Sequence, residues 1–385
     1  MRRVCECRVE EIERGRQSPE LTGRASGTFW RATTTWAVGI VASTLIFGQF
    51  VSAHAADAPS VPATSARPNT PPRGAAPPVA PASATRIILL GTAGGPGIIR
   101  QRSEPATLLV VDGRPYLIDA GESVSRQIVL ANFQLAQVRN IFITHHHADH
   151  NAGLPALLSL QWFARSLGPP QPPEQIYGPP STEFLVKTAI DYLSVSERIF
   201  RAGIPQMLPS NRMFEAHDID HDGVVYTDDK VKVTAAENSH FSFKSTAPDG
   251  TLDRSYAYRF DTKYGSVVFT GDTGLTESVE RLARGADVLV SEVRGTAPGA
   301  AEIEMPVSSE PPNTAGGALM YHMQHEHMTP EEVGIMAQAA RAKIVILTHI
   351  VPAGDEDIAP LTAGVRKTFH GVVIPGKDFL EYDLD

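Results

Sequence analysis

Two patterns of apolar and polar residues alternate along the chain from residue 86 onward. Short apolar runs that end in Gly or Asp are typical of strands closed by turns. They predict strands at residues 86–91, 106–113, 114–121, 139–144, 230–237, 255–262, 266–272, 287–293 and 343–349. Apolar residues at helical spacing predict helices at residues 153–167, 181–193, 274–285 and 329–342. Because strands and helices interleave and hairpins are frequent, the pattern predicts a layered α/β fold of mixed sheets with helices outside.

Two local signals sharpen this picture. Asp112-Gly113 separates two apolar runs and predicts a β-hairpin. Thr329 followed by Pro330 offers an N-cap and a proline in the first helical position, and Glu332 supplies the carboxylate of a capping box. A helix is therefore expected to begin directly after His327.

The N-terminal part reads as an export signal. The run at residues 36–51 is apolar and uncharged but short for a membrane span; it follows Arg24 and Arg31 and precedes Ala53-His54-Ala55. This pattern predicts a signal peptide over residues 1–55, cleaved after about Ala55, and hence a periplasmic or secreted protein without further membrane association. An uncleaved N-terminal anchor is the alternative.

The remaining chain divides into a tether and one domain. Residues 56–85 are dominated by Pro, Ala and Ser without apolar periodicity, which predicts a disordered linker. Residues 86–385 contain no second linker of this kind, so we expect a single domain. Cys5 and Cys7 both fall within the predicted signal peptide, so the mature chain would have no disulfide and no thiolate metal ligand.

The charge balance narrows the class of partner. The chain carries a formal charge of -9, and removal of residues 1–55 leaves 27 Lys and Arg against 38 Asp and Glu, or -11. Sequence-independent binding of nucleic acid needs clustered basic side chains. No nucleic-acid partner is therefore expected.

Histidines concentrate in the stretch IFITHHHADHNAG, residues 141–153. So many imidazoles would be costly inside a helix or strand, where each needs a buried hydrogen-bond partner. In a loop after a strand, His145 and His147 can point the same way, with His146 turned aside, while Asp149 and His150 continue round the loop. Imidazole nitrogen and carboxylate oxygen suit Zn²⁺ or a similar divalent ion.

Three further strand ends carry one possible ligand each. They are His240, Asp272 and His349, each at or just beyond the end of an apolar strand. Taken alone, each residue is weak evidence for a metal site, because a lone histidine is more often a surface residue and Asp272 lies in a Gly-rich turn sequence. Their coincidence predicts one metal site assembled from several strand ends.

Together these residues resemble a known family. His145-x-His147-x-Asp149-His150, followed by the three later ligands, resembles the metallo-β-lactamase superfamily of hydrolases over residues 86–385. The resemblance implies a four-layered αβ/βα sandwich with two metal ions at one edge of the sheets. By matching position it assigns His145, His147 and His240 to a first Zn²⁺, Asp149, His150 and His349 to a second, and Asp272 to a bridge between them. Mn²⁺ and Fe also suit such ligands, so the identity of the metal is left open.

Other segments are similar to one branch of that family. LLGTAGGP at 89–96, YLIDAGES at 116–123 and the segments at 286–293 and 327–349 resemble ribonuclease Z and the zinc-dependent arylsulfatases. The resemblance implies a proton relay formed by Glu292 and His327. Two positions depart from the branch: Ser291 replaces its usual histidine, and Met328 its usual Ser or Thr.

This combination predicts a hydrolase. Two metals sharing a hydroxide would supply the nucleophile, Asp149 would orient or deprotonate it, and the Glu292–His327 pair would protonate the leaving group. We expect an exported hydrolase of small esters, arylsulfatase-like or phosphodiesterase-like. The alternatives are a lactonase or β-lactamase, a ribonuclease Z-type endonuclease, and a metal-dependent binding protein without catalysis. A homodimer is left open.

One long segment without periodicity lies between the relay residues. Residues 293–326 are rich in Pro, Gly and Met and predict a mobile lid that supplies Met320, Tyr321 and Met323 to an apolar leaving-group pocket. Within it, His322 and His325 are expected to be solvated rather than extra ligands. The pair His217 and His221 is expected in a surface turn.

Overall fold

The computed structural model describes residues 84–241, 243, 245–246, 250–294, 314–351 and 358–384. The predicted signal peptide, and all of the predicted linker except its last two residues, lie outside this part. None of the described helices is long and apolar enough to cross a membrane.

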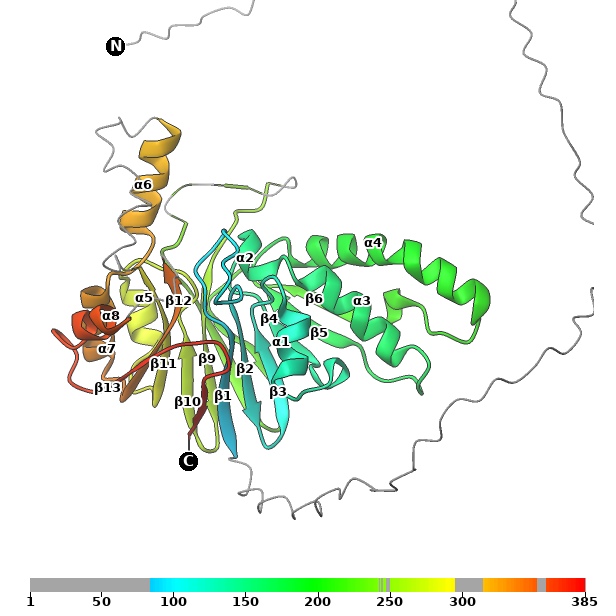
Figure 1. The fold of residues 1–385 in the computed structure, drawn as a ribbon, viewed down its shortest axis with the longest axis horizontal. Helices are drawn as coiled ribbons and strands as arrows, with labels where there is room; N and C mark the ends of the chain where they lie inside the picture. The colour runs from blue at the N-terminus through cyan, green and yellow to red at the C-terminus, as the bar shows by residue number, and fades with distance from the viewer. Residues whose placement is uncertain are drawn as a thin grey trace, which may run out of the picture. The chain divides into compact units, whose positions relative to one another are not determined.

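The first of two seven-stranded sheets in the described part comes mainly from the N-terminal half (Figure 1). Its strands are β14 (Glu381–Asp383), β1 (Thr85–Gly91), β2 (Ala106–Val111), β3 (Arg114–Ile118), β4 (Asn140–Phe142), β5 (Glu174–Gly178) and β6 (Phe214–Asp218), in that spatial order. Strands β3 to β6 run parallel, whereas β14, β1, β2 and β3 pair antiparallel. The sheet is therefore mixed, as the interleaved pattern predicts.

The second sheet repeats this plan with the C-terminal half. Its strands are β13 (Val372–Pro375), β12 (Ile344–Val351), β11 (Val288–Arg294), β10 (Gly265–Phe269), β9 (Tyr256–Thr262), β8 (Val231–Glu237) and β7 (Gly223–Thr227). Strands β10 to β13 are parallel, and β7 to β10 are antiparallel. In both sheets parallel strands deliver their carboxyl ends to a common edge.

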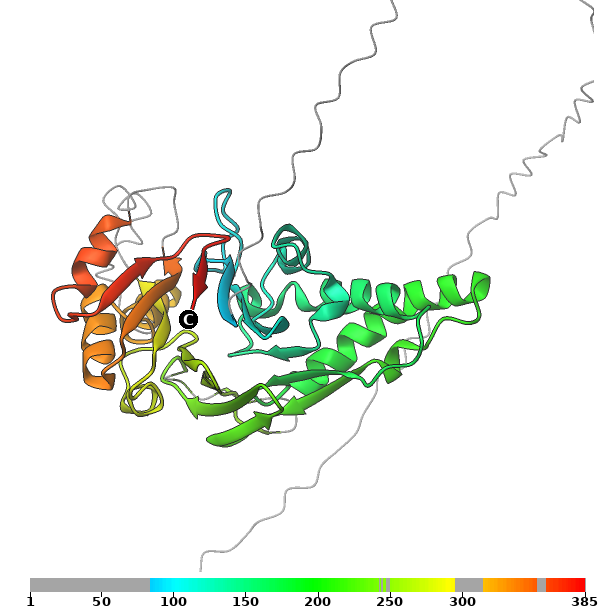
Figure 2. The ribbon, with the colours of Figure 1, turned by 90° about the horizontal axis from the view of Figure 1, so that it is seen from below.

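Helices cover the outer face of each sheet (Figures 1 and 2). The first sheet is covered by α1 (Val124–Leu130), α3 (Leu154–Arg165) and α4 (Thr182–Gly203), and the second by α5 (Glu277–Leu282), α7 (Pro330–Ala340) and α8 (Ala359–Val365). The remaining helices are α2 (Ala148–Asn151), α6 (Ala315–His325) and the 3-10 turns η1 (Leu135–Gln137) and η2 (Ser210–Arg212).

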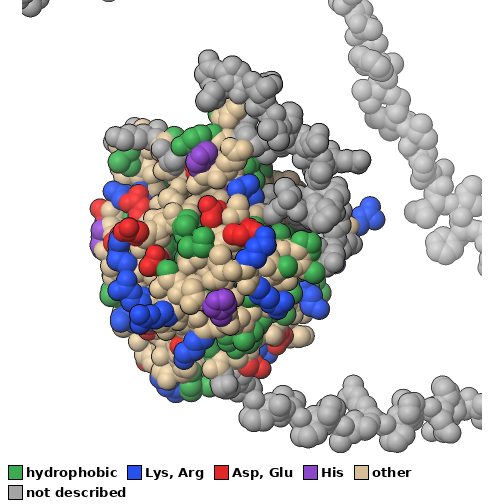
Figure 3. Space-filling model, turned by 90° about the vertical axis from the view of Figure 1, so that its left-hand side faces the viewer, with side chains coloured by type: hydrophobic (Ala, Val, Ile, Leu, Met, Phe, Trp, Pro, Cys, Tyr) green, Lys and Arg blue, Asp and Glu red, His purple; other side chains and the backbone are tan. Residues whose placement is uncertain are grey.

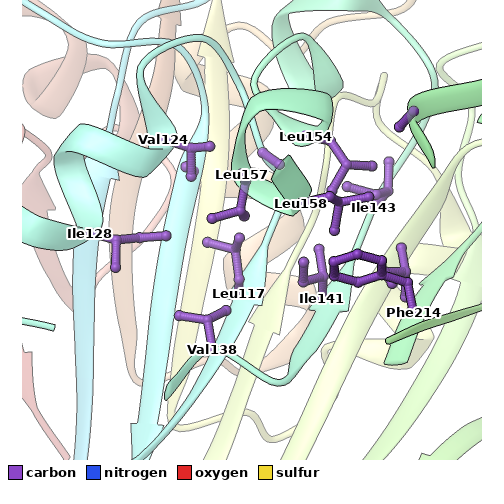
Figure 4. Close-up of a cluster of buried hydrophobic side chains, with 14 of the residues drawn as sticks. Leu117, Val124, Ile128, Val138, Ile141, Ile143, Leu154, Leu157, Leu158 and Phe214 are labelled. Atoms are coloured by element: carbon purple, nitrogen blue, oxygen red, sulfur yellow. The ribbon is translucent and has the colours of Figure 1, made fainter. Parts of the chain in front are cut away.

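Three apolar layers hold the sandwich together. Figure 4 shows the first, in which Leu154, Leu157 and Leu158 of α3 pack onto Leu117 and Ile141 of the first sheet. A second lies between the second sheet and its helices, and a third, rich in aromatic rings, lies between the two sheets. Since burial of apolar area is the main favourable contribution to folding, these layers explain the αβ/βα arrangement, which confirms the predicted fold class.

The local signals at turns and caps are confirmed. Asp112 and Gly113 both take positive φ values, 47° and 79°, as the tight turn between β2 and β3 requires. At the start of α7 the Thr329 side chain accepts a hydrogen bond from the Glu332 backbone N–H, and the Glu332 side chain accepts one from the Thr329 backbone N–H.

Two expectations were wrong. The segment 293–326 was predicted to lack regular structure, but residues 315–325 form helix α6. Thr314 is its N-cap, and the Thr314 side chain accepts a hydrogen bond from the Gly317 backbone N–H. Gly and Met obscure its periodicity, while its Ala and Leu residues favour a helix. His217 lies in β6 and stacks on Tyr177 rather than in a turn. The part of the predicted lid at residues 295–313 lies outside the described residues.

Candidate metal centre

The seven predicted ligands come together at the edge of the sandwich where parallel strands end, the upper edge in Figure 1. His145 follows β4, and the next turn is α2, with His147 as its N-cap and Asp149 and His150 in its single turn. The other members follow or lie in strands of the second sheet; they are His240 after β8, Asp272 after β10 and His349 in β12. Both sheets therefore contribute to one cluster.

Three imidazoles form the first group. His147 Nδ1 lies 3.1 Å from His145 Nε2 and 3.0 Å from His240 Nε2. His145 and His240 are fully buried, and His147 is half-buried at the mouth of a cavity. Three ring nitrogens at such distances can share one cation between their lone pairs.

Two imidazoles and two carboxylates form the second group. His349 Nε2 lies 3.0 Å from Asp272 Oδ2 and 3.3 Å from Asp149 Oδ2, and His150 Nε2 lies 3.3 and 3.5 Å from the same two oxygens. All four residues are buried. Asp272 Oδ2 also lies 3.9 Å from His145 Nε2 and 3.8 Å from the Nε2 of His240, so this oxygen stands between the two groups.

A β-bulge aims His349 at the cluster. Along the parallel pair of β11 and β12, Glu292 is opposite Thr348 and Val293 is opposite Ile350, so His349 is left without a partner. Its φ of 42° lies in the left-handed region, which is unfavourable for a residue other than glycine. Bulges of this kind commonly redirect a side chain beside an active site.

Hydrogen bonds behind the cluster fix which ring nitrogen faces inward. His150 Nδ1 donates to Asp119 Oδ2 at 2.8 Å, and His240 Nδ1 donates to the Glu326 carbonyl oxygen at 3.1 Å. With those hydrogen bonds made by Nδ1, Nε2 of each ring is the nitrogen that faces inward. Partners of this type orient the histidine ligands of metal sites.

Several polar atoms of the cluster are buried without a hydrogen-bond partner. Among the described residues these include His150 Nε2, Asp272 Oδ1 and His349 Nδ1. Buried polar atoms are normally satisfied, because leaving one unpaired costs about 1–3 kcal/mol. His150 Nε2 is left unpaired beside Asp272 Oδ2 and Asp149 Oδ2, at 3.3 and 3.5 Å, and such a combination of imidazole nitrogen and carboxylate oxygen is the donor set expected of a divalent metal site.

Charge in the cluster agrees with this interpretation. Burial lowers the pKa of His145 and His240 well below the ordinary value, and neighbouring imidazoles add to the effect, so both rings are neutral. Burial also opposes protonation of His349, but the carboxylates of Asp272 and Asp149 outweigh it and raise its pKa to about 10. The paired carboxylates thus stabilise positive charge at the centre of the second group.

The predicted relay residues stand beside the second group. His327 Nδ1 lies 3.2 Å from Glu292 Oε2, and the other carboxylate oxygen of Glu292 accepts from the Met328 backbone N–H at 2.7 Å. Burial lowers the pKa of His327, but the charge and hydrogen bond of Glu292 outweigh it and raise that pKa. The departure at Met328 does not break this contact, because only its backbone takes part; its side chain is buried in the apolar layer under α7.

Glycine is required where the loop after β1 crosses the site. The Gly95 backbone N–H donates to Asp149 Oδ2 at 3.1 Å, and a Cβ atom at residue 95 would lie 2.2 Å from the Asp149 Cβ. No other residue fits at that distance. The TAGG sequence thus lets the backbone itself hold the Asp149 carboxylate.

Two residues that the sequence reasoning did not place at the site, Asp119 and His322, belong to it. Asp119 follows β3, is buried, and contacts His150 and Thr144. Its signal was visible, since LIDAG repeats the pattern of an apolar strand that ends in Asp. His322 of α6 was expected in solvent, but its Nδ1 contacts the buried Glu326 carboxylate and its Nε2 lies 3.4 Å from His327 Nε2. His325, in contrast, is exposed as expected.

Comparisons with known proteins agree with the fold. Residues 114–350 match the family model described as the beta-lactamase superfamily domain. A ribonuclease Z of Mycolicibacterium gilvum is 28% identical over 274 residues, covering 70% of this chain and 87% of that protein. A ribonuclease Z of Bacillus licheniformis is 27% identical over 340 residues, covering 77% and 98%.

Solved structures show the same fold. The metallo-beta-lactamase fold protein YhfI from Bacillus subtilis superposes with a TM-score of 0.55 at 18% identity, covering 77% of this chain and 98% of that one. The short form of human tRNase Z gives a TM-score of 0.54 at 20% identity, covering 78% and 99%. The family model spans more than half of the chain, and the chain therefore belongs to the metallo-β-lactamase superfamily.

Proposed function

We propose that the protein is a metal-dependent phosphodiesterase that holds two divalent ions in the cluster of seven side chains. The observation that carries the proposal is that four buried ring nitrogens drawn from both groups, the Nε2 atoms of His145, His240, His150 and His349, lie within 3.9 Å of Asp272 Oδ2. His145, His147 and His240 would hold the first ion, Asp149, His150 and His349 the second, and Asp272 would touch both. The nitrogen and carboxylate donors suit Zn²⁺, with Mn²⁺ and Fe as alternatives.

Such ions, when bound, activate a water for attack and neutralise charge on the phosphoryl oxygens. The chain's own groups then position the reactants. Asp149 Oδ2, fixed by the Gly95 N–H, lies at the cavity where it can orient the attacking water. As the bond from phosphorus to the leaving oxygen breaks, His327 Nε2 can give its proton to that oxygen, while Glu292 holds the opposite nitrogen.

The relatives support phosphodiester cleavage over the other ester chemistries. Those compared are named ribonuclease Z, and cleavage of RNA is hydrolysis of a phosphodiester. This brings RNA back as a candidate substrate, against the expectation from composition that no nucleic acid is bound. A ribonuclease Z-type endonuclease is thus the second candidate function. Sulfate esters are the other class of small ester predicted from the sequence, and an aryl sulfate is included in the test below.

The surroundings of the site favour a small diester over RNA. The cavity above the cluster has a volume of about 950 Å³, and no Lys or Arg is among the described residues that line it. The face shown in Figure 3 carries both basic and acidic side chains. Strong binding of a polynucleotide needs several Lys or Arg contacts to phosphates.

The test is hydrolysis by the purified, zinc-loaded protein of four substrates: a bis-aryl phosphate, an aryl sulfate, a lactone and a precursor tRNA. We expect metal-dependent cleavage of the diester, lost in Asp272→Asn together with bound metal. Cleavage of the tRNA alone would favour the second candidate. Cleavage of only the sulfate or the lactone would overturn the phosphodiesterase.

We also propose that the protein acts outside the cytoplasm. The support is the apolar segment at residues 36–51 and the Pro-rich stretch that follows it. Expression in a bacterial host with N-terminal sequencing of the mature protein tests this. A start near residue 56 in the periplasmic fraction is expected, and an intact N-terminus in the cytoplasmic fraction would contradict it.

A further inference from the structure

Building on the proposed function, we propose that α6 and Phe243 form a subsite for the leaving group, and that this group is an uncharged aromatic alcohol. Nothing in the catalytic cluster itself selects one phosphodiester over another. The selectivity would come from the wall of the cavity above it.

Apolar side chains line that wall without being buried. Leu319 and Tyr321 of α6 are each 48% exposed, and Phe243 is 51% exposed, although all three border the same cavity as the cluster. Met323 of α6 lines it as well. Apolar groups that stay in contact with water beside a polar site are typical of a place where a ligand covers them.

One face of α6 carries both an apolar and a polar part of this wall. Leu319, His322, Met323 and Glu326 follow the spacing i, i+3, i+4 and i+7, which places them on one side of the helix and its last turn. All four line the cavity. The apolar part is therefore continuous with the His322–Glu326 pair.

That pair places the apolar wall on the leaving-group side of the scissile bond. His322 Nδ1 contacts the Glu326 carboxylate, and His322 Nε2 lies 3.4 Å from His327 Nε2. In the proposed reaction His327 Nε2 is the atom that protonates the leaving oxygen. A group attached to that oxygen would therefore extend along α6.

The charges around the cavity argue for an uncharged group. Asp149, Asp272 and Glu326 are the acidic residues that line it, and among the described lining residues there is no Lys or Arg to pair with a further phosphate. A nucleotide leaving group would bring negative charge to the same wall. The rings of Phe243 and Tyr321 instead border the cavity, and a flat ring can stack on Phe243 beside Tyr321, one face of which stacks on His325 with 4.2 Å between ring centroids.

The experiment compares methyl phosphodiesters with a phenyl and a 2-naphthyl leaving group. Each kcat/KM is divided by the hydroxide rate of the same ester in water, which removes differences in leaving-group acidity. We expect the corrected ratio of naphthyl to phenyl to be roughly tenfold or more in the zinc-loaded protein, since one added apolar group in a fitting pocket changes rates by about that factor. Leu319→Ala and Phe243→Ala should each lower the ratio severalfold.

The matched control is Leu160→Ala on α3, because Leu160 is also 48% exposed but does not line the cavity. It should leave the ratio unchanged. A ratio near one, or a ratio that the two subsite variants do not change while the phenyl ester is hydrolysed normally, would overturn the subsite.

A binding measurement separates failure of the subsite from failure of the proposed function. Calorimetry with 2-naphthol is expected to show binding to the protein and its loss in Phe243→Ala. If no diester is hydrolysed but this binding is seen, the subsite stands and the phosphodiesterase falls. If 2-naphthol does not bind, the subsite falls whatever the hydrolysis results.

Discussion

The Asp119 carboxylate holds His150 from behind, with Oδ2 2.8 Å from His150 Nδ1. Its Oδ1 accepts from the Thr144 backbone N–H at 2.8 Å, so both oxygens are engaged and tie α2 to the start of the histidine loop. Asp119 itself has a φ of 59°, a left-handed value that Asp tolerates better than most residues. A residue with no place in the predicted ligand set thus orients one of its members.

We predict that Asp119→Asn weakens metal binding by about 10–100-fold, as is typical for loss of a carboxylate behind a histidine ligand. The amide has one accepting oxygen where Asp119 uses two, so either His150 or Thr144 loses its acceptor. Competition with a chromophoric zinc chelator measures the change. Asp220→Asn is the control, because Asp220 pairs with His221 at 2.7 Å in full contact with solvent. Equal affinities for both variants would contradict a role in orienting His150.

We predict that Glu292→Gln lowers kcat for diesters with poor leaving groups by about 10²-fold or more, and much less for nitrophenyl esters. The Gln side chain can still accept from the Met328 N–H, but its amide would face His327 Nδ1 with a donor. Without the Glu292 charge that raises the pKa of His327, the ring is no longer held as the cation, and the neutral ring that accepts from this amide is a much weaker acid at Nε2. Metal content should not change. Glu331→Gln, an exposed partner of Lys367, is the control. A uniform loss across leaving groups would count against proton donation by this pair.

We predict that Asp228→Ala lowers the free energy of unfolding by about 1–3 kcal/mol. Asp228, after β7, accepts from the hydroxyl of Tyr116 at 2.6 Å and of Tyr226 at 2.9 Å, and Tyr116 is fully buried in the opposite sheet. Removal of the carboxylate leaves that hydroxyl without its acceptor. Urea unfolding measures the loss. Asp229→Ala, one residue on and mostly exposed, should cost less than about 1 kcal/mol.

We predict that the difference in unfolding free energy between the wild type and Asp228→Ala depends on pH. Burial raises the pKa of Asp228, but hydrogen bonds from Tyr116, the backbone N–H groups of Lys230 and Val231, and Tyr226 outweigh it, and the folded-state pKa is lowered. The stabilisation is therefore present above the unfolded-state pKa and is lost as pH falls through the folded-state value. The difference in unfolding free energy between the wild type and Asp228→Ala should shrink in acid. A difference independent of pH would show that the charge of Asp228 does not contribute.

We predict that Thr329→Ala costs about 1 kcal/mol of stability, since the Thr329 side chain caps α7 by accepting from the Glu332 N–H. Thr276 at the start of α5 provides the comparison, because its side chain makes no cap hydrogen bond. In thermal unfolding, Thr329→Ala should therefore lose more stability than Thr276→Ala. Equal losses would mean that the cap contributes little in this fold.

Much of the site could be predicted because its signals are local. The histidine motif lies within one loop, and a ligand at the end of an apolar strand is visible from the strand alone, as at Asp272 and His349. The hairpin at Asp112-Gly113 and the cap at Thr329 are likewise set by neighbouring residues. Their proposed roles as ligands, and the role of Thr329 as a cap, follow from side-chain chemistry that can be read from the sequence.

Tertiary structure decided what depends on contacts between distant segments. The bulge that gives His349 a positive φ arises from pairing with β11, and helix α6 brings His322 to His327 although Gly and Met hide its periodicity. Asp119 became part of the site only when β3 and β4 paired side by side. The sequence by itself determined which groups can bind a metal and which strands carry them. Only folding decided their orientation and the wall of the cavity, because both depend on packing between residues far apart in the chain.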